Sequence, residues 1–198
     1  MRTSTNLAAA NAVSADRFLN SVSMKVGAYT LDETTIGTNG ARHVNVTHTA
    51  GDTVDTLGTI TITGTDLAGQ TISEVITPSS GTLVAGKKWF RTVTGAVGAG
   101  WVIDASEGTA DTVEIGYGAE ICVLDGAGQL EAIIVNTTAA ATIVVADAGG
   151  TIATLKASIG EGHYEYDLDV MDLTVDLNGA SNVTVVHSPS LPKTYAMS

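Results

Sequence analysis

The chain has little of several residue types on which common protein classes depend. Its 198 residues include one cysteine, three prolines, two tryptophans and two phenylalanines. Cys122 alone cannot form an intrachain disulfide or a multi-cysteine zinc site. The sequence contains no run of 18 or more apolar residues, so it predicts no membrane-spanning helix. The segment 7–13, interrupted by Asn11, is too short to predict a secretory signal. We therefore expect a core held together by packing.

Basic residues are also scarce, with 9 Lys and Arg against 21 Asp and Glu, a net charge of −12 and a pI near 4.4. Nucleic acids and anionic membranes are bound largely through positive charge, so both are disfavoured partners. Residues 1–100 carry seven acidic and seven basic residues, whereas residues 101–198 carry fourteen and two. This division predicts a neutral first half suited to packing and an acidic second half that prefers water.

Thr and Val make up about a quarter of the chain, which also has 22 glycines and a mean hydropathy of +0.24. β-Branched residues with many turn glycines favour strands over a helix bundle, and the hydropathy argues against a disordered chain. No long 3.6-residue period appears, which excludes a βαβ nucleotide-binding fold. The length suits one larger domain or two small ones.

Period-two alternation predicts the strands. Segments 59–63 and 71–77, separated by a turn, predict a hairpin with one face buried, in which Ile60 and Ile62 share a face, as do Ile72 and Ile76. Glycine-rich residues 95–100 predict a flexible loop, and residues 124–128 a turn between two domains. The other expected strands cover residues 43–49, 82–85, 88–94, 101–104, 112–117, 130–136, 142–146, 151–157, 163–168, 173–177 and 183–187.

We accordingly predict an all-β fold of two small β-sandwich or jelly-roll-like domains preceded by an extended N-terminal arm. Six strands at roughly ten-residue spacing in the second half suit a sandwich or small barrel. The expected boundaries are an arm over 1–20, a neutral domain over 21–124, an acidic domain over 125–190 and an extended tail over 191–198.

No motif predicts catalysis. The stretch 95–100 is followed by Trp101-Val102-Ile103, which looks like a strand, where a phosphate-binding loop needs a lysine and a helix. Neither a G-x-S-x-G elbow nor an H-E-x-x-H motif occurs. His43 and His48 would lie on opposite faces of a strand and cannot chelate one metal. We expect His43, His48, His163 and His187 to be exposed on strands and Cys122 to be buried.

The most pronounced local feature is acidic: Glu161, Glu165, Asp167, Asp169, Asp172 and Asp176. A solvated face opposite Tyr164 and Tyr166 is the favoured interpretation, and a calcium site stays an alternative. A sugar site built from Tyr117, Tyr164 and Tyr166 also stays open, while Trp89, Phe90 and Trp101 are expected to fill the first core. We therefore predict no enzyme activity and no catalytic, cofactor-binding or metal-ligating residue.

Three segments resemble a known class of proteins. Thr59–Ile76 resembles a TITGTDxxGxxxxEVI hairpin common in virion proteins of tailed bacteriophages. Lys88–Thr94 resembles the KxFxTVT strand that usually follows it, and Asp111–Gly118 a DTVxIGxG strand. Segments 150–157 and 182–186 are similar to small β-domains of the same class. The resemblance covers roughly residues 55–190 and transfers no catalytic residues.

The resemblance implies a bacteriophage capsid decoration (cement) protein on the outer surface of the virion head, which stabilises the capsid by bridging neighbouring major capsid proteins. The neutral domain would face the shell or other copies, and the acidic domain would face outward. The implied partners are the major capsid protein and the chain itself, as a homo-oligomer, most simply a trimer. The alternatives are a tail or tail-spike adaptor and a carbohydrate-binding β-sandwich module.

Overall fold

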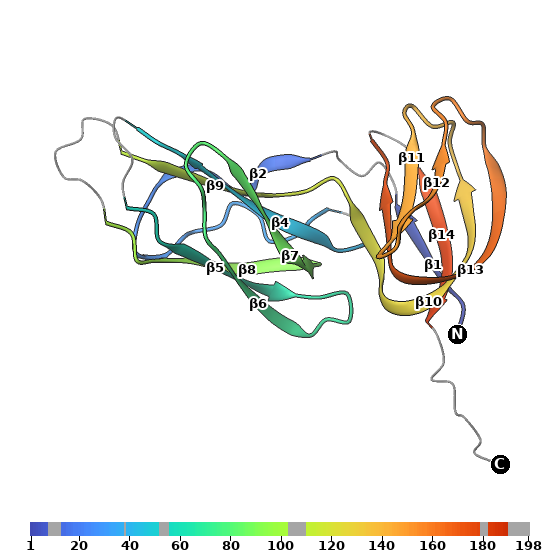
Figure 1. Ribbon diagram of the computed structural model, residues 1–198, viewed down its shortest axis with the longest axis horizontal. Helices are drawn as coiled ribbons and strands as arrows, with labels where there is room; N and C mark the ends of the chain where they lie inside the picture. Colours follow the sequence, from blue (N-terminus) through green and yellow to red (C-terminus); the bar gives the residue numbers. More distant parts are fainter. Residues whose placement is uncertain (8–12, 38, 52–55, 103–109, 179–181, 190–198) are drawn as a thin grey trace, which may run out of the picture. The chain divides into compact units, whose positions relative to one another are not determined.

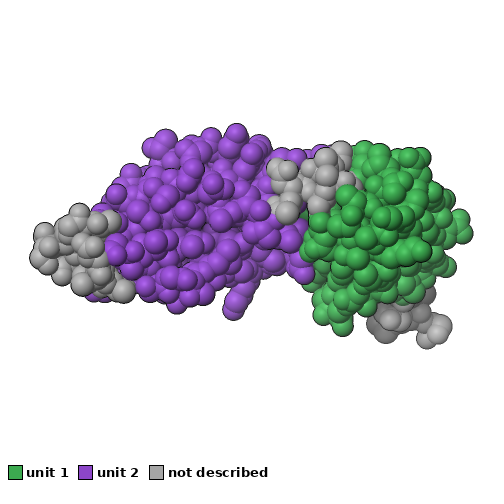
Figure 2. All heavy atoms as spheres, turned by 90° about the horizontal axis from the view of Figure 1, so that it is seen from above, with its two compact units in different colours: residues 1–10, 121–198 green, residues 11–120 purple. Residues whose placement is uncertain are grey.

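The structure, a computed structural model, describes residues 1–7, 13–37, 39–51, 56–102, 110–178 and 182–189. These residues form antiparallel strands and no helix, which confirms the predicted all-β class. Accordingly, the described part of the chain contains no helix of the length and apolarity needed to cross a membrane. The chain divides into two compact units, unit 1 (residues 1–10 and 121–198) and unit 2 (residues 11–120), coloured separately in Figure 2.

Unit 2 is a β-sandwich of two four-stranded sheets (Figure 1). The β4 sheet has the order β2 (Ser14–Ser23), β9 (Thr112–Tyr117), β4 (Arg42–Thr49), β7 (Leu83–Phe90). The β5 sheet has the order β3 (Gly27–Ala28), β8 (Thr92–Ala99), β5 (Thr59–Thr65), β6 (Thr71–Ile76). Inward side chains of both sheets form one core, which includes Phe18, Val44, Val46, Ile60, Ile62, Phe90, Val93 and Ile115.

The predicted hairpin is confirmed as β5 and β6. Ile60 and Ile62 are fully buried, and the threonines between them face outward. The turn is closed by Asp66, whose carboxylate accepts a hydrogen bond from the Gln70 amide at 2.8 Å, and by Gly69 at a φ of +78°. Alternation of β-branched residues with a tight polar turn therefore suffices to specify this element.

The free edges of the two sheets are tied together by Glu74 and Lys88. The Glu74 carboxylate on β6 accepts hydrogen bonds from the amides of Lys87 and Lys88 on β7, at 2.7 and 3.1 Å. The Lys88 ammonium donates to the Ser73 carbonyl at 2.8 Å. These bonds occupy backbone groups that an incoming strand would otherwise use, which protects this side of the sandwich from edge-to-edge aggregation.

The glycine-rich stretch 95–100 is not a loop, so this prediction is wrong. Residues 92–99 form β8, which pairs with β5 along its length. A Cβ atom on Gly98 would lie 2.3 Å from the Lys25 carbonyl oxygen and 2.5 Å from the Trp101 Nε1 atom. Glycine at this position serves close packing against Trp101 rather than flexibility.

Unit 1 is one six-stranded antiparallel sheet folded around its own core. Its order is β1 (Thr3–Leu7), β14 (Val183–Pro189), β10 (Ile121–Val135), β13 (Gly162–Asp176), β11 (Ile143–Asp147), β12 (Gly150–Leu155). The two long strands, β10 and β13, curve strongly (Figure 1). Their inward residues, with those of β11 and β14, enclose a core that includes Ile121, Leu130, Ile133, Val145, Leu173 and Val185.

The domain boundary expected at residues 124–128 is wrong, because β10 runs through this stretch. Its pairing with β13 shifts register between Cys122 and Leu124 and again between Leu124 and Ala127. Gly126 has a φ of +92°, and its amide donates to the Asp172 carboxylate at 2.7 Å. The turn-forming residues thus make bulges that bend a continuous strand, and the units change at residues 120 and 121.

The first 20 residues differ from the expected arm. Residues 3–7 form β1, an edge strand of unit 1 that pairs with β14, and residues 14–23 form β2 in unit 2. Unit 2 is therefore inserted between β1 and β10, and the expected division into domains over 21–124 and 125–190 differs from the observed units. The tail expected over 191–198 lies outside the described residues.

Candidate interaction surface

The single cysteine is chemically protected, as predicted. The Cys122 side chain is fully buried in β10, and its thiol donates to the Leu124 carbonyl at 3.4 Å. Burial, assisted by the nearby negative charge of Asp125, raises the pKa of the thiol to about 12. Because the thiolate is the reactive form, this environment makes Cys122 a poor nucleophile and a poor metal ligand at neutral pH.

The histidines occupy two different environments. His43 and His48 lie on opposite faces of β4, as predicted, but the expectation that the strand histidines are exposed is wrong for His48 and His187, which are buried. His48 Nε2 lies 2.7 Å from the Asp111 carboxylate inside unit 2, with both side chains fully inaccessible. The contact with the Asp111 carboxylate explains why a polar residue can continue the buried face of β4.

His187 lies in unit 1 beside β1. Its Nε2 atom is 3.1 Å from the Thr5 hydroxyl, and its buried Nδ1 atom has no hydrogen-bond partner among the described residues. Burial lowers the pKa of His187 below its usual value, partly opposed by the Glu131 carboxylate. The neutral imidazole is therefore the form that the fold accommodates.

Unit 1 should lose stability in mild acid through His187. The folded-state pKa of His187 lies below the unfolded value of about 6.5. The contribution of neutral His187 to the free energy of unfolding is therefore fully present above about pH 6.5. It falls as the pH drops further, by at most about 1.4 kcal/mol per pH unit for one group. Urea unfolding of the wild type and of His187→Gln at several pH values measures this. The difference in free energy of unfolding between the wild type and His187→Gln should change below pH 6.5. A difference that stays constant contradicts the role given to His187.

The aromatic residues are distributed differently from the prediction. Phe90 and Trp101 belong to the unit 2 core, as expected, but Trp89 does not. Trp89 instead stacks on His43 across β7 and β4, with ring centroids 3.5 Å apart. Tyr117 is buried in unit 2, whereas Tyr164 and Tyr166 pack partly against the core of unit 1. The three tyrosines therefore do not form one sugar site.

The acidic residues of β13 also act separately. Asp172 accepts the Gly126 amide, and the Asp176 carboxylate accepts the Asn178 amide at 2.9 Å. Asp167 accepts from the Gln129 side chain at 2.7 Å. Within the residues that the structure describes, no group of three His, Cys, Asp or Glu side chains could hold a metal ion. The calcium alternative therefore receives no support.

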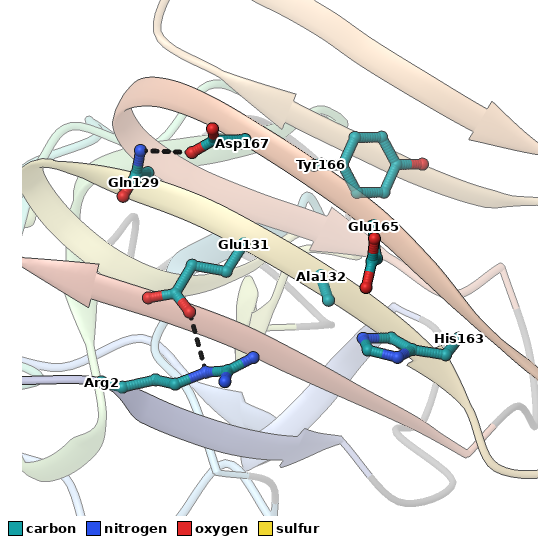
Figure 3. A pocket seen from close by; sticks show the side chains of 8 residues that line it. All are labelled: Arg2, Gln129, Glu131, Ala132, His163, Glu165, Tyr166 and Asp167. Atoms are coloured by element: carbon teal, nitrogen blue, oxygen red, sulfur yellow. Dashed lines mark hydrogen bonds and ion pairs between the residues drawn. The ribbon is translucent and has the colours of Figure 1, made fainter.

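A polar hollow of about 310 Å³ lies on unit 1, between residues of β10 and β13 and the side chain of Arg2, which precedes β1 (Figure 3). Two residues of β13, Tyr166 and Asp167, lie opposite one residue of β10, Glu131, because the register shifts at this point. The Arg2 Nε atom pairs with the Glu131 carboxylate at 2.7 Å. The hollow is further lined by Gln129, Ala132, His163 and Glu165. Sequence analysis missed Arg2, Gln129 and Glu131, because only the pairing of distant strands brings them to this place.

The expected neutral and acidic halves do not coincide with the units. Unit 2 contains twelve acidic and six basic residues, and unit 1 contains nine and three, so each unit has a net charge of −6. The division at residue 100 cuts through unit 2. Any uncharged surface must therefore be sought on a particular face rather than in one half of the chain.

The outer face of the β5 sheet is such a surface. Val75 and Val97, respectively 61% and 44% exposed, flank Thr61 in the ladder, and Ala28 lies beyond Val97. The only charged residue within these four strands, Glu74, turns toward β7 instead. We call this surface the neutral face; its other members are Thr59, Thr63, Thr65, Thr71, Ser73, Thr94, Gly95 and Ala99.

The area of the neutral face is small for a stable one-to-one complex. Four strands about 4.8 Å apart and seven residues at about 3.3 Å give an area of about 400 Å². A standard protein interface buries about 800 Å² on each partner. A single contact through this face is therefore weak, and its strength would come from repetition or from a second contact.

Comparison of the chain with protein-family models, with curated proteins and with solved structures finds no match.

Proposed function

We propose that the chain is a bacteriophage capsid decoration protein that attaches to the outer surface of the head through the neutral face of unit 2. The observation that carries this proposal is a four-stranded sheet face without charged side chains on a chain of net charge −12. Such a face excludes partners selected by charge and suits an uncharged protein surface.

The size of the neutral face supports a repeating partner. An interface of this area binds weakly in isolation, whereas a capsid presents the same site many times and can be bridged by several copies of the protein. The resemblance of Thr59–Ile76 and Asp111–Gly118 to virion proteins points to the same class of partner. Homo-oligomerisation, most simply as a trimer, would place several neutral faces on one particle site.

Substitution of Val97 by Glu should reduce binding to heads that lack this protein by about tenfold or more, because a carboxylate would be desolvated against an uncharged surface. Cosedimentation of purified protein with such heads measures this. Leu168→Glu is the matched control, since Leu168 on unit 1 is 43% exposed against 44% for Val97. It should bind like the wild type.

Equal binding of the Val97 and Leu168 variants would remove the neutral face from the proposal. Cryo-electron microscopy of the particle tests the location independently. Density at many positions on the outer shell supports a decoration protein, whereas density confined to the tail favours the adaptor alternative.

A further inference from the structure

The polar hollow on unit 1 combines hydrogen-bond donors and acceptors from two adjacent strands, β10 and β13, and from Arg2, which precedes β1. Arg2 uses its Nε atom for Glu131, and Figure 3 shows its two other nitrogens directed away from that pair. Glu165 and His163, two positions apart on β13, face the same hollow. Ala132, which pairs with Glu165 from β10, is small and leaves the space open.

The Glu165 carboxylate makes no hydrogen bond or ion pair with another described residue, in contrast to Glu131 and Asp167. It is therefore an acceptor whose capacity is not used within the described fold. The hollow thus offers acceptors at one side and a guanidinium at the other.

The lining excludes several classes of ligand. Three carboxylates against one arginine, itself already paired, repel phosphates and other anions. No metal-binding group of side chains occurs within the described residues. Six of the eight lining residues carry polar or charged side chains other than tyrosine, which disfavours a purely apolar ligand. A ligand whose groups both donate and accept, without charge, matches the remaining chemistry.

We propose that this hollow binds a neutral saccharide unit. Sugar hydroxyls donate and accept simultaneously, so vicinal hydroxyls can donate to the Glu165 carboxylate while others accept from the Arg2 guanidinium. The volume of about 310 Å³ is at the lower end for small-molecule sites and suits one or two sugar rings. The bulge of β13 at Tyr166 and Asp167 widens the surface and holds Asp167 against Gln129. This site is separate from the neutral face of unit 2.

Saturation-transfer NMR on the full chain tests the proposal. The probes are the methyl glycosides of glucose, galactose, mannose, rhamnose and N-acetylglucosamine, each at millimolar concentration. We expect transfer to at least one glycoside, and Glu165→Ala should weaken its binding at least tenfold. Glu165→Gln, which keeps an acceptor oxygen, should weaken it less. Glu161→Ala is the control, because it removes an exposed carboxylate near the same strand that does not line the hollow.

Failure of all five glycosides to receive saturation overturns the proposal, as does binding that is unchanged in Glu165→Ala. Binding of spermidine without binding of any glycoside also overturns it, since the hollow would then be a site for cations. Thermal unfolding of each variant shows whether unit 1 is intact, and Glu165→Gln serves as the measurement if Glu165→Ala does not fold. Binding to heads should be unaffected in every variant, so this test and that of the neutral face fail independently.

Discussion

Replacement of Asp111 by Ala should destabilise unit 2 by several kcal/mol, roughly 1–3 kcal/mol for each hydrogen-bond partner that loses its acceptor inside the unit. The Asp111 carboxylate lies 2.7 Å from His48 Nε2 and accepts the Gly51 amide at 2.7 Å. Both side chains are inaccessible to solvent. His48 Nδ1 already has no hydrogen-bond partner among the described residues, so loss of the carboxylate would leave the imidazole with none on either nitrogen.

Urea unfolding followed by tryptophan fluorescence measures this effect selectively, because both tryptophans, Trp89 and Trp101, belong to unit 2. Asp66→Ala is the control. Asp66 also accepts one backbone amide, from Gln70 at 2.8 Å, but on the surface, so its loss should cost less than about 1 kcal/mol. A cost for Asp111→Ala as small as that of Asp66→Ala would show that the pair is not buried in solution.

Substitution of Leu7 by Ala should destabilise unit 1 by about 2–5 kcal/mol, the usual cost of removing a buried leucine side chain. Leu7 is fully buried in the core of unit 1, although it belongs to a five-residue edge strand. The cavity would lie in the core beneath β1, and among the described strands only β14 pairs with β1 and holds it in place. Unit 2 should keep its stability, since Leu7 contributes nothing to its core.

Hydrogen exchange at Val183 and Val185, which oppose Leu7 and Thr5 in the ladder, reports on this change. Both amides should exchange faster in Leu7→Ala, while tryptophan fluorescence of unit 2 stays unchanged. Thr3→Ala, an exposed position on the same strand, should alter exchange very little. Unchanged exchange in Leu7→Ala would mean that residues 3–7 do not belong to unit 1, and the expected arm would regain support.

The parts of the fold that depend on local alternation could be predicted from the sequence. The β5–β6 hairpin is one example, because Ile60, Ile62 and the Asp66 turn lie within a few residues of each other. The pairing of β1 with β14 could not be predicted, since Thr3 and His187 are separated by nearly the whole chain. Nothing in a short polar strand specifies so distant a partner before the core is assembled.

Glycines and polar residues account for the other differences. Gly98 and Gly126 give the same local signal as turn residues, but one permits packing against Trp101 and the other forms a bulge in β10. His48 continues the inward face of β4, and its burial depends on Asp111, a residue 63 positions away. The alternating threonines of β5, which form part of the neutral face, could be recognised in the sequence. The hollow could not, because only the fold brings Arg2 next to Glu131 on β10.

The insertion of unit 2 between β1 and β10 sets the order in which the protein can fold during synthesis. Once residues 11–120 have left the ribosome, unit 2 has all its strands. β1 was made earlier, yet its neighbour β14 is the last of the described strands and ends about 70 residues beyond unit 2. At ~5–20 residues per second this delay is roughly 3 to 14 s. Throughout that interval the nascent chain carries a folded unit 2 and an unpaired β1. The exposed Leu7 side chain of β1 is then available to chaperones or to neighbouring nascent chains.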